Sequence, residues 1–256
     1  MLHGVRLGLG LIGIGKRWGH VAAEPPSELD ALELLEFALG LGVRLFDTAS
    51  SYGASEERLA SFLKALNPSE RRELTIATKF GEHWDADRQE PFVDHSYEAL
   101  RRSLDRSVAR LGEIDILQLH KTTPEVLRGE DLGRAWEYAS SLGVRALGAS
   151  VSDLESAELV LADPRYQLLQ LPYNLLNPKF GGVIDRATER GLSVLVNRPF
   201  AMGAMLHSGE VPSHAQAFEY ILQRPFNGAI LTGTKSKTHL AQNWLAFEES
   251  LRSQSA

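Results

Sequence analysis

Eight apolar, strand-like runs alternate with helix-like segments along the chain, and this alternation constrains the fold more than any other feature of the sequence. Each run is apolar throughout rather than at every second residue, which is typical of a parallel sheet covered by helices. Eight such units predict an α/β fold, a (β/α)8 TIM barrel with outer helices. The runs cover roughly residues 7–12, 44–47, 74–79, 114–120, 145–150, 168–173, 193–198 and 229–233.

Two of the intervening segments carry clear helical periodicity. Apolar side chains recur at spacings of four, four and three, which places them on one face of a helix. One stripe consists of Leu100, Leu104, Val108 and Leu111. The other lies near the C-terminus and consists of Leu240, Trp244, Phe247 and Leu251. We expect both stripes to pack against the barrel.

The length and continuity of the chain predict one domain over residues 1–256. A chain of 256 residues is normal for a single barrel. No linker, low-complexity segment or composition break divides it. Two polar or proline-containing stretches, Pro25-Pro26 and residues 82–94, are predicted to be loops.

Composition excludes several classes of partner and chemistry. The net charge of −6 gives no reason to expect a nucleic acid or an acidic membrane surface as a partner. The absence of cysteine excludes disulfides and thiolate catalysis and fits a cytoplasmic location. No apolar run approaches the length of a membrane span. The sequence does not decide the oligomeric state, although it slightly favours a monomer.

An open doubly wound sheet is the alternative architecture. It requires a glycine-rich turn between a strand and a phosphate-binding helix. Gly8-Leu-Gly10 and Gly13-Ile-Gly15 resemble such a turn, but residues 16–20 make a poor start for a helix. No acidic residue ends the next strand in the expected way, so these glycines are interpreted as part of a loop at the barrel mouth.

Four polar residues of different chemistry gather at three successive predicted strand ends. Asp47, Lys79 and His120 each close an apolar run, and Tyr52 follows Asp47 by five residues. Catalytic residues of parallel barrels collect at the carboxyl ends of the strands. A lysine ammonium lowers the pKa of a nearby tyrosine, and a carboxylate keeps that ammonium charged. The group therefore predicts a tuned general acid for a developing alkoxide, with the histidine orienting the substrate oxygen.

The residues around this group resemble the signature of the aldo-keto reductase family. The resemblance begins with Asp47-x-Ala49-x-x-Tyr52-Gly53 and Ser55-Glu56 and extends over essentially the whole chain. It implies a (β/α)8 barrel that reduces small carbonyl compounds with NADPH or, less often, NADH. It also implies that Tyr52 is the proton donor, that Lys79 and Asp47 tune it, and that His120 orients the carbonyl.

The same resemblance implies a set of cofactor contacts. Ser150 and Gln170 match positions that bind the nicotinamide carboxamide, while Gly233, Thr234 and Lys235 form a loop suited to a phosphate. The remaining predicted cofactor residues are Arg198, which could contact the pyrophosphate, Phe200, His239, Gln242 and the adenine-contacting Asn243.

Some residues depart from the family pattern. Val151 replaces a common asparagine, His239 replaces a common arginine and Gln242 replaces a common glutamate. The stretch after the seventh run also lacks an aromatic residue at the nicotinamide-stacking position. Lys235 and Lys237 nevertheless leave that corner cationic, so we expect NADPH to be the preferred cofactor, with NADH possible. Apolar candidates for the substrate pocket are Trp18, Trp84, Met202 and Phe200.

Three other functions fit parts of this pattern. A cofactor-binding regulatory or sensor subunit with little turnover would retain the same dinucleotide contacts. An aldolase would use Lys79 as a Schiff-base former, which requires a neutral amine and conflicts with a partnering Asp47. A metal-dependent hydrolase needs clustered ligands, and only His120 qualifies clearly, so no metal site is predicted.

Overall fold

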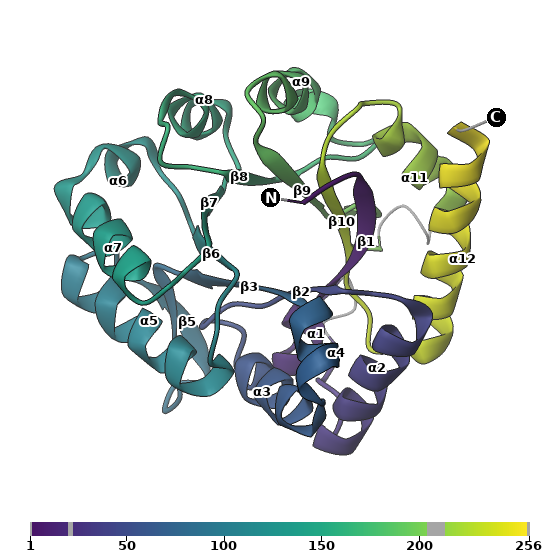
Figure 1. Ribbon diagram of the computed structural model, residues 1–256, viewed down its shortest axis with the longest axis horizontal. Coiled ribbons are helices and arrows are strands. Elements are labelled where there is room, and N and C mark those ends of the chain that lie inside the picture. The colour runs from purple at the N-terminus through teal and green to yellow at the C-terminus, as the bar shows by residue number, and fades with distance from the viewer. Residues whose placement is uncertain (1, 20–22, 204–212, 255–256) are drawn as a thin grey trace.

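Eight parallel strands close into a barrel in the computed structural model, which describes residues 2–19, 23–203 and 213–254 (Figure 1). The strand order around the barrel is β1-β10-β9-β8-β7-β6-β3-β2. This arrangement confirms the predicted (β/α)8 barrel and excludes the open sheet. The barrel strands are β1 (Val5–Gly10), β2 (Leu45–Asp47), β3 (Thr75–Phe80), β6 (Ile116–Leu119), β7 (Ala146–Ser150), β8 (Leu168–Pro172), β9 (Ser193–Asn197) and β10 (Gly228–Thr232).

The first strand closes the barrel because it pairs on both sides. Leu9 lies opposite Phe46 of β2 and opposite Thr232 of β10. The close packing inside requires glycine at Gly8, where a Cβ atom would lie 2.7 Å from Cδ2 of Leu231. Two glycines interpreted from the sequence as loop residues, Gly8 and Gly10, therefore belong to a strand instead.

Helices form the outer layer around the strands (Figure 1). Both predicted apolar stripes face inward, since Leu100, Leu104 and Leu111 of α5 and Leu240 and Phe247 of α12 are buried. The main helices are α2 (Glu28–Leu41), α3 (Ser55–Ala65), α5 (Tyr97–Leu111), α7 (Glu130–Ser141), α8 (Leu154–Ala162), α9 (Gly181–Glu189), α11 (His214–Leu222) and α12 (Lys237–Gln254). Shorter turns are α1 (Ile12–Gly15), α4 (Pro68–Glu73), α6 (Pro124–Arg128), η1 (Pro178–Phe180) and η2 (Ala201–Gly203).

Polar caps fix where several helices begin. The side chain of Ser27 accepts a hydrogen bond from the backbone N–H of Asp30, and that of Asp153 accepts one from Ser156. These contacts satisfy N–H groups that have no partner within the helix. Pro25 and Pro26 lie outside regular structure just before the Ser27 cap, as predicted. No helix in the described part of the chain is long and apolar enough to cross a membrane.

The polar stretch from residue 82 to residue 94 is a β-hairpin, so the prediction of a loop there was wrong. Strand β4 (Glu82–Asp85) pairs antiparallel with β5 (Glu90–Val93). Its turn is held by the Asp85 side chain, which accepts hydrogen bonds from the N–H groups of Asp87 and Arg88. The hairpin begins one residue after Gly81, directly beyond the carboxyl end of β3.

The barrel interior is filled by apolar side chains, and polar side chains lie at the carboxyl ends of the strands. A cluster of buried apolar side chains fills the interior; it comprises Leu2, which precedes β1, and the strand residues Leu45, Ala77, Ile116, Leu168, Leu195, Ala229 and Leu231. Polar side chains follow further along the strands, at or just past their carboxyl ends. The fold therefore places chemistry at one mouth of the barrel, as in other parallel barrels.

Candidate active site

An ion pair lies at the base of the polar end of the barrel. Asp47 is the last residue of β2, and Lys79 lies near the end of the neighbouring strand β3. The ammonium of Lys79 donates to Oδ2 of Asp47 over 2.6 Å and to the backbone carbonyl of Thr48 over 2.9 Å. Only 1% of the Lys79 side chain is exposed, so solvent hardly screens this pair.

A buried glutamine completes the surroundings of Asp47. Nε2 of Gln118, on β6, donates to Oδ1 of Asp47 over 3.0 Å. Both carboxylate oxygens therefore have a donor. Gln118 is fully buried and was not identified from the sequence, because it lies within an apolar run that the pattern explains as a strand.

Lys79 remains an ammonium in these surroundings. Burial alone disfavours the charged form, but the Asp47 carboxylate and Tyr52 outweigh it, so the pKa of Lys79 is raised. A Schiff-base lysine needs the opposite, a neutral amine. The geometry therefore disfavours the aldolase interpretation.

Tyr52 lies on the loop between β2 and α3, against this ion pair. The Nζ atom of Lys79 is 5.1 Å from the centre of the Tyr52 ring. Burial raises the pKa of the Tyr52 phenol, and the Lys79 ammonium acts in the opposite direction. The net shift is upward, contrary to the lowered pKa expected from the sequence, because burial outweighs the ammonium.

His120 follows β6 and completes the predicted group of four. Its ring meets that of Tyr52 edge to face, with 5.8 Å between the ring centres. Nδ1 of His120 is 3.2 Å from Oε2 of Glu82 and 3.4 Å from Oγ of Ser51. Burial, followed by the charges of Lys79, Lys121 and Lys16, lowers the pKa of His120 well below its usual value. The imidazole is therefore neutral at physiological pH.

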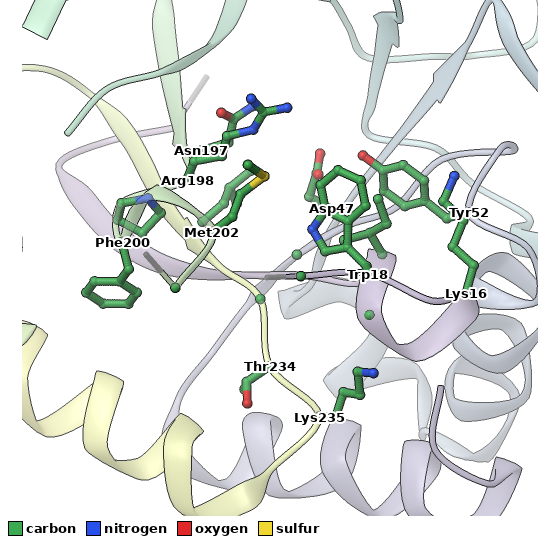
Figure 2. Close-up of a pocket in the computed structure, with 18 of the residues that line it drawn as sticks. Lys16, Trp18, Asp47, Tyr52, Asn197, Arg198, Phe200, Met202, Thr234 and Lys235 are labelled. Carbon is green, nitrogen blue, oxygen red and sulfur yellow. The ribbon is translucent and has the colours of Figure 1, made fainter. Parts of the chain in front are cut away.

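A cavity of about 870 Å³ opens above these residues. This volume lies within the range of small-molecule and cofactor sites. The predicted residues that line it are Trp18, Asp47, Tyr52, His120, Ser150, Gln170, Arg198, Phe200, Met202, Gly233, Thr234, Lys235, His239, Gln242 and Asn243. Figure 2 shows Trp18, Asp47, Tyr52 and Lys16 on one side, Arg198, Phe200 and Met202 on the other, and Thr234 and Lys235 below them.

Two predicted site residues do not line this cavity. Lys79 lies behind Asp47 as its buried partner. Trp84 belongs to the β4–β5 hairpin, where its ring meets the ammonium of Lys16, 5.4 Å from the ring centre. Trp84 is not among the residues that surround this cavity, and its role as a substrate-pocket residue stays a prediction.

Two residues that line the cavity, Gln170 and Asn197, each have a side-chain oxygen without a hydrogen-bond partner among the described residues. Oε1 of Gln170 and Oδ1 of Asn197 are buried, and no donor among the described residues reaches them. Ser150 lies directly opposite Gln170 on the neighbouring strand. The amide groups of Gln170 and Asn197 and the hydroxyl of Ser150 line the cavity, and such groups can exchange hydrogen bonds with a ligand that carries a carboxamide.

The loop between β10 and α12 forms the other end of the cavity. Lys235 lines it and donates hydrogen bonds to the backbone carbonyls of Ala23 and Glu24. Lys237 does not line it, because its ammonium pairs with Glu33 at 2.5 Å. Lys235 and His239 line the cavity, whereas Lys237 does not, and the cofactor contacts predicted for all three stay predictions.

The aromatic and sulfur-containing candidates lie at the rim. Trp18 is 39% exposed and Met202 is 47% exposed, so both side chains are accessible to a ligand in the cavity. Phe200 is mostly buried and packs edge to face against Phe218 and His214. Arg198 has a φ of +55° and an exposed side chain, and its carbonyl accepts from Asn174.

Several lining residues escaped the sequence analysis. They are Lys16, Glu82, Lys121, Asn197 and His214. Glu82 and Lys121 each follow a predicted catalytic residue by one to three positions, and this proximity was the available signal. Lys16 lies in a stretch that was judged only as a helix start.

Comparison with known proteins identifies the family to which the chain belongs. The sequence profile of the aldo/keto reductase family matches residues 6–218. The chain belongs to the aldo-keto reductase family. Aldo-keto reductases are NAD(P)H-dependent oxidoreductases that act on carbonyl compounds, so this chain is an enzyme of that class.

Individual aldo-keto reductase relatives agree with this assignment. The 6-dehydroglucose reductase of Novosphingobium aromaticivorans is 34% identical over 89% of this chain and 76% of its own length. The aldo-keto reductase yakc [NADP(+)] of Schizosaccharomyces pombe is 25% identical over 78% of this chain and 61% of its own length. A solved structure described as an aldo-keto reductase of Pseudomonas aeruginosa is 28% identical, with a TM-score of 0.80 over 96% of this chain and 90% of its own.

Proposed function

We propose that this aldo-keto reductase uses NADPH to reduce aldehydes or ketones to alcohols, with Tyr52 as the proton donor. The observation that carries the proposal is the position of Tyr52 against the buried Lys79–Asp47 pair, at the edge of a cavity that is open to a ligand. A phenol next to a fixed ammonium can release its proton to a developing alkoxide, because the ammonium stabilises the phenolate that remains.

The nicotinamide supplies the hydride when the dinucleotide is bound. Gln170 and Asn197 line the cavity and would hold the carboxamide through their side-chain amides. Ser150 lies beside Gln170 and offers a hydroxyl to the same group. These residues would hold the nicotinamide in the same cavity as Tyr52, and proximity of this kind accounts for a large part of enzymatic rate enhancement.

The proton follows a short path. The raised pKa of Tyr52 keeps the phenol protonated at neutral pH, so the acid is loaded before the substrate arrives. As negative charge develops on the substrate oxygen, Tyr52 gives its proton to that oxygen. Lys79 then faces the phenolate, while Asp47 holds the ammonium in position. His120 borders the same cavity and orients the substrate oxygen.

The dinucleotide phosphates fit the loop between β10 and α12. Lys235 and His239 supply positive charge or N–H donors there, and Gly233 and Thr234 present backbone N–H groups close by. We propose that these residues bind the adenosine end, with Asn243 and Gln242 next to it. The printed name of the yakc relative contains NADP(+), which supports NADPH as the preferred cofactor.

One experiment tests this proposal. Purified protein is titrated with NADPH and with NADH while tryptophan fluorescence is followed, since Trp18 lines the cavity. Oxidation of the bound dinucleotide is then measured with a panel of aldehydes and ketones. We expect saturable binding and carbonyl-dependent oxidation. Tight binding without turnover on any carbonyl would favour a sensor subunit, and no binding would contradict the proposal.

A further inference from the structure

Glu82 is an acidic side chain in the active site that the proposed reaction does not use. Its Oε2 lies 3.2 Å from Nδ1 of His120, and its Oε1 lies 3.2 Å from Nζ of Lys121. Only 8% of the Glu82 side chain is exposed. A carboxylate placed this deeply, in contact with the substrate-orienting histidine, affects the protons that this histidine carries.

Three neighbouring segments fix Glu82 in place. Oγ of Ser51 donates to Oε2 of Glu82 over 2.7 Å, and Oγ of Ser50 donates to its backbone carbonyl over 3.1 Å. Gly81 precedes it with a φ of +101°, and a Cβ atom there would lie 2.7 Å from the ring of His95. The side chain therefore has one defined orientation, in which Oε1 faces Lys121 and Oε2 faces His120.

The hydrogen-bond inventory then determines the tautomer of His120. An ionised glutamate only accepts hydrogen bonds, so Nδ1 of His120 must be the donor. A neutral imidazole that carries its proton on Nδ1 has a bare Nε2. Among the described residues, no hydrogen bond occupies Nε2 of His120, and the ring borders the cavity.

The charges around the ring decide how easily a second proton is added. Glu82 favours the imidazolium, whereas Lys79, Lys121, Lys16 and His95 oppose it. The titratable and charged groups that face His120 are thus Glu82, Lys79, Lys121, Lys16, His95 and Tyr52. Burial adds to the opposition, so the pKa of His120 is low and the free enzyme holds the neutral ring.

We propose that Glu82 is a positioning residue that fixes the proton of neutral His120 on Nδ1, so that Nε2 must gain a proton before it can donate a hydrogen bond to a substrate oxygen. The proposal rests on the proposed carbonyl reduction, in which His120 contacts that oxygen. Glu82 acts through His120 and does not itself touch the substrate. An aspartate that orients a catalytic histidine has the same relation to its ring in serine proteases.

The variant Glu82→Gln provides a sharp test because the flanking groups decide how the amide lies. The ammonium of Lys121 can only donate, so the amide oxygen takes the Oε1 position facing Lys121. The amide NH2 then takes the Oε2 position, where it donates to Nδ1 of His120 and to Oγ of Ser51, whose hydroxyl becomes the acceptor. This exchange moves the ring proton to Nε2. Ser51→Ala is the matched control, because it removes a contact to Glu82 but leaves the carboxylate.

The first measurement is the tautomer itself, by NMR of protein carrying 15N-labelled histidine, without cofactor or substrate. His120→Asn assigns the signal. We expect the proton on Nδ1 in the wild type and in Ser51→Ala, and on Nε2 in Glu82→Gln. A wild-type proton on Nε2, or a Glu82→Gln ring that keeps its proton on Nδ1, would overturn the proposal. If the Glu82→Gln variant does not fold, the position of the His120 proton in the wild type still decides whether the proposal holds.

The second measurement is the pH profile of kcat/KM for carbonyl reduction, followed from neutral pH down to the lowest pH at which the protein stays folded, because the pKa of His120 lies well below its usual value. In the wild type, kcat/KM should fall as pH rises through the pKa of His120, by at most about tenfold per pH unit for one proton. In Glu82→Gln this dependence should be absent, since Nε2 already carries a proton. A merely structural role would lower kcat/KM equally at every pH, and that result would contradict the proposal.

The two measurements separate this inference from the proposed function. The tautomer is read without any turnover. An Nδ1 proton in a protein that reduces no carbonyl would leave the arrangement of Glu82 and His120 standing and reject the reductase. Carbonyl reduction by a wild-type protein whose His120 proton lies on Nε2 would support the reductase and reject the proposed role of Glu82.

Discussion

Nζ of Lys79 and Oδ2 of Asp47 lie 2.6 Å apart in a part of the barrel from which solvent is almost excluded. Each side chain is the last or nearly the last polar residue of its strand, and β2 and β3 are neighbours in the barrel. The pair therefore follows directly from strand order. Its burial makes it more sensitive to the loss of one partner than an exposed pair would be.

We predict that Lys79→Met destabilises the fold as well as abolishing turnover. The change leaves the Asp47 carboxylate buried without its ammonium, which typically costs about 3–5 kcal/mol. Urea unfolding at neutral pH measures this cost. The double variant Asp47→Asn/Lys79→Met should recover much of the lost stability without recovering activity. If Lys79→Met were as stable as the wild type, the Asp47 carboxylate would not depend on the Lys79 ammonium for its burial, and the prediction would be contradicted.

Two buried glutamines should respond in opposite ways to replacement by leucine. Gln170→Leu removes an acceptor that has no partner, so the free energy of unfolding should stay level or rise slightly. Its affinity for NADPH should fall by roughly tenfold, the equivalent of one hydrogen bond of about 1.4 kcal/mol.

Gln118→Leu is the matched control, because Gln118 donates to Asp47 and does not line the cavity. We expect it to lower stability. Thermal unfolding of both variants, with and without NADPH, provides the comparison. Unchanged NADPH affinity in Gln170→Leu would remove Gln170 from the proposed carboxamide site.

The lysines at the start of α12 should differ in their effect on cofactor choice. Lys235 lines the cavity, whereas Lys237 pairs with Glu33. Lys235→Ala should weaken NADPH by about tenfold and spare NADH, since a charge-assisted hydrogen bond to the 2′-phosphate is lost. Lys237→Ala should leave the ratio of the two affinities unchanged. Fluorescence titrations at two salt concentrations test both, and equal effects of the two variants would show that the loop does not read the phosphate.

The pH dependence of reduction on the alkaline side should reflect the raised pKa of Tyr52. Because burial raises this pKa above its ordinary value of about 10, the phenol stays protonated and active as pH rises from neutrality. Apart from the fall that the His120 proton causes, we expect kcat/KM to show no additional downward break from tyrosine ionisation between about pH 7 and pH 10. A fall centred near pH 8 would show that Lys79 dominates over burial.

The barrel and the four catalytic candidates could be predicted because both depend on local sequence. A buried parallel strand is an apolar run, and the residue that ends such a run lies at the barrel mouth whatever its distant neighbours are. Asp47, Lys79 and His120 were found in this way. The assignment of residues 1–256 to one domain stays a prediction, as do the roles of the site residues.

The parts that sequence reasoning missed depend on contacts between distant segments. The second strand of the β4–β5 hairpin, Glu90–Val93, is exposed at every residue, so it gives no signal of a buried apolar run. Lys237 meets Glu33 across 204 positions. The direction of the Tyr52 pKa shift depends on how much of the phenol is buried, which the pattern of residues does not reveal. The sequence did not reveal the role of Glu82 because its partner His120, which follows β6, is distant in the chain.

The most direct test of the central proposal is single-turnover oxidation of bound NADPH by an aldehyde in the wild type and in Tyr52→Phe. The phenylalanine keeps the ring and its packing but removes the proton. We predict that NADPH binds both proteins with similar affinity and that oxidation slows by roughly 10²–10⁴-fold in the variant, the usual contribution of a general acid. Oxidation at the wild-type rate in Tyr52→Phe would contradict the assignment of Tyr52 as the proton donor.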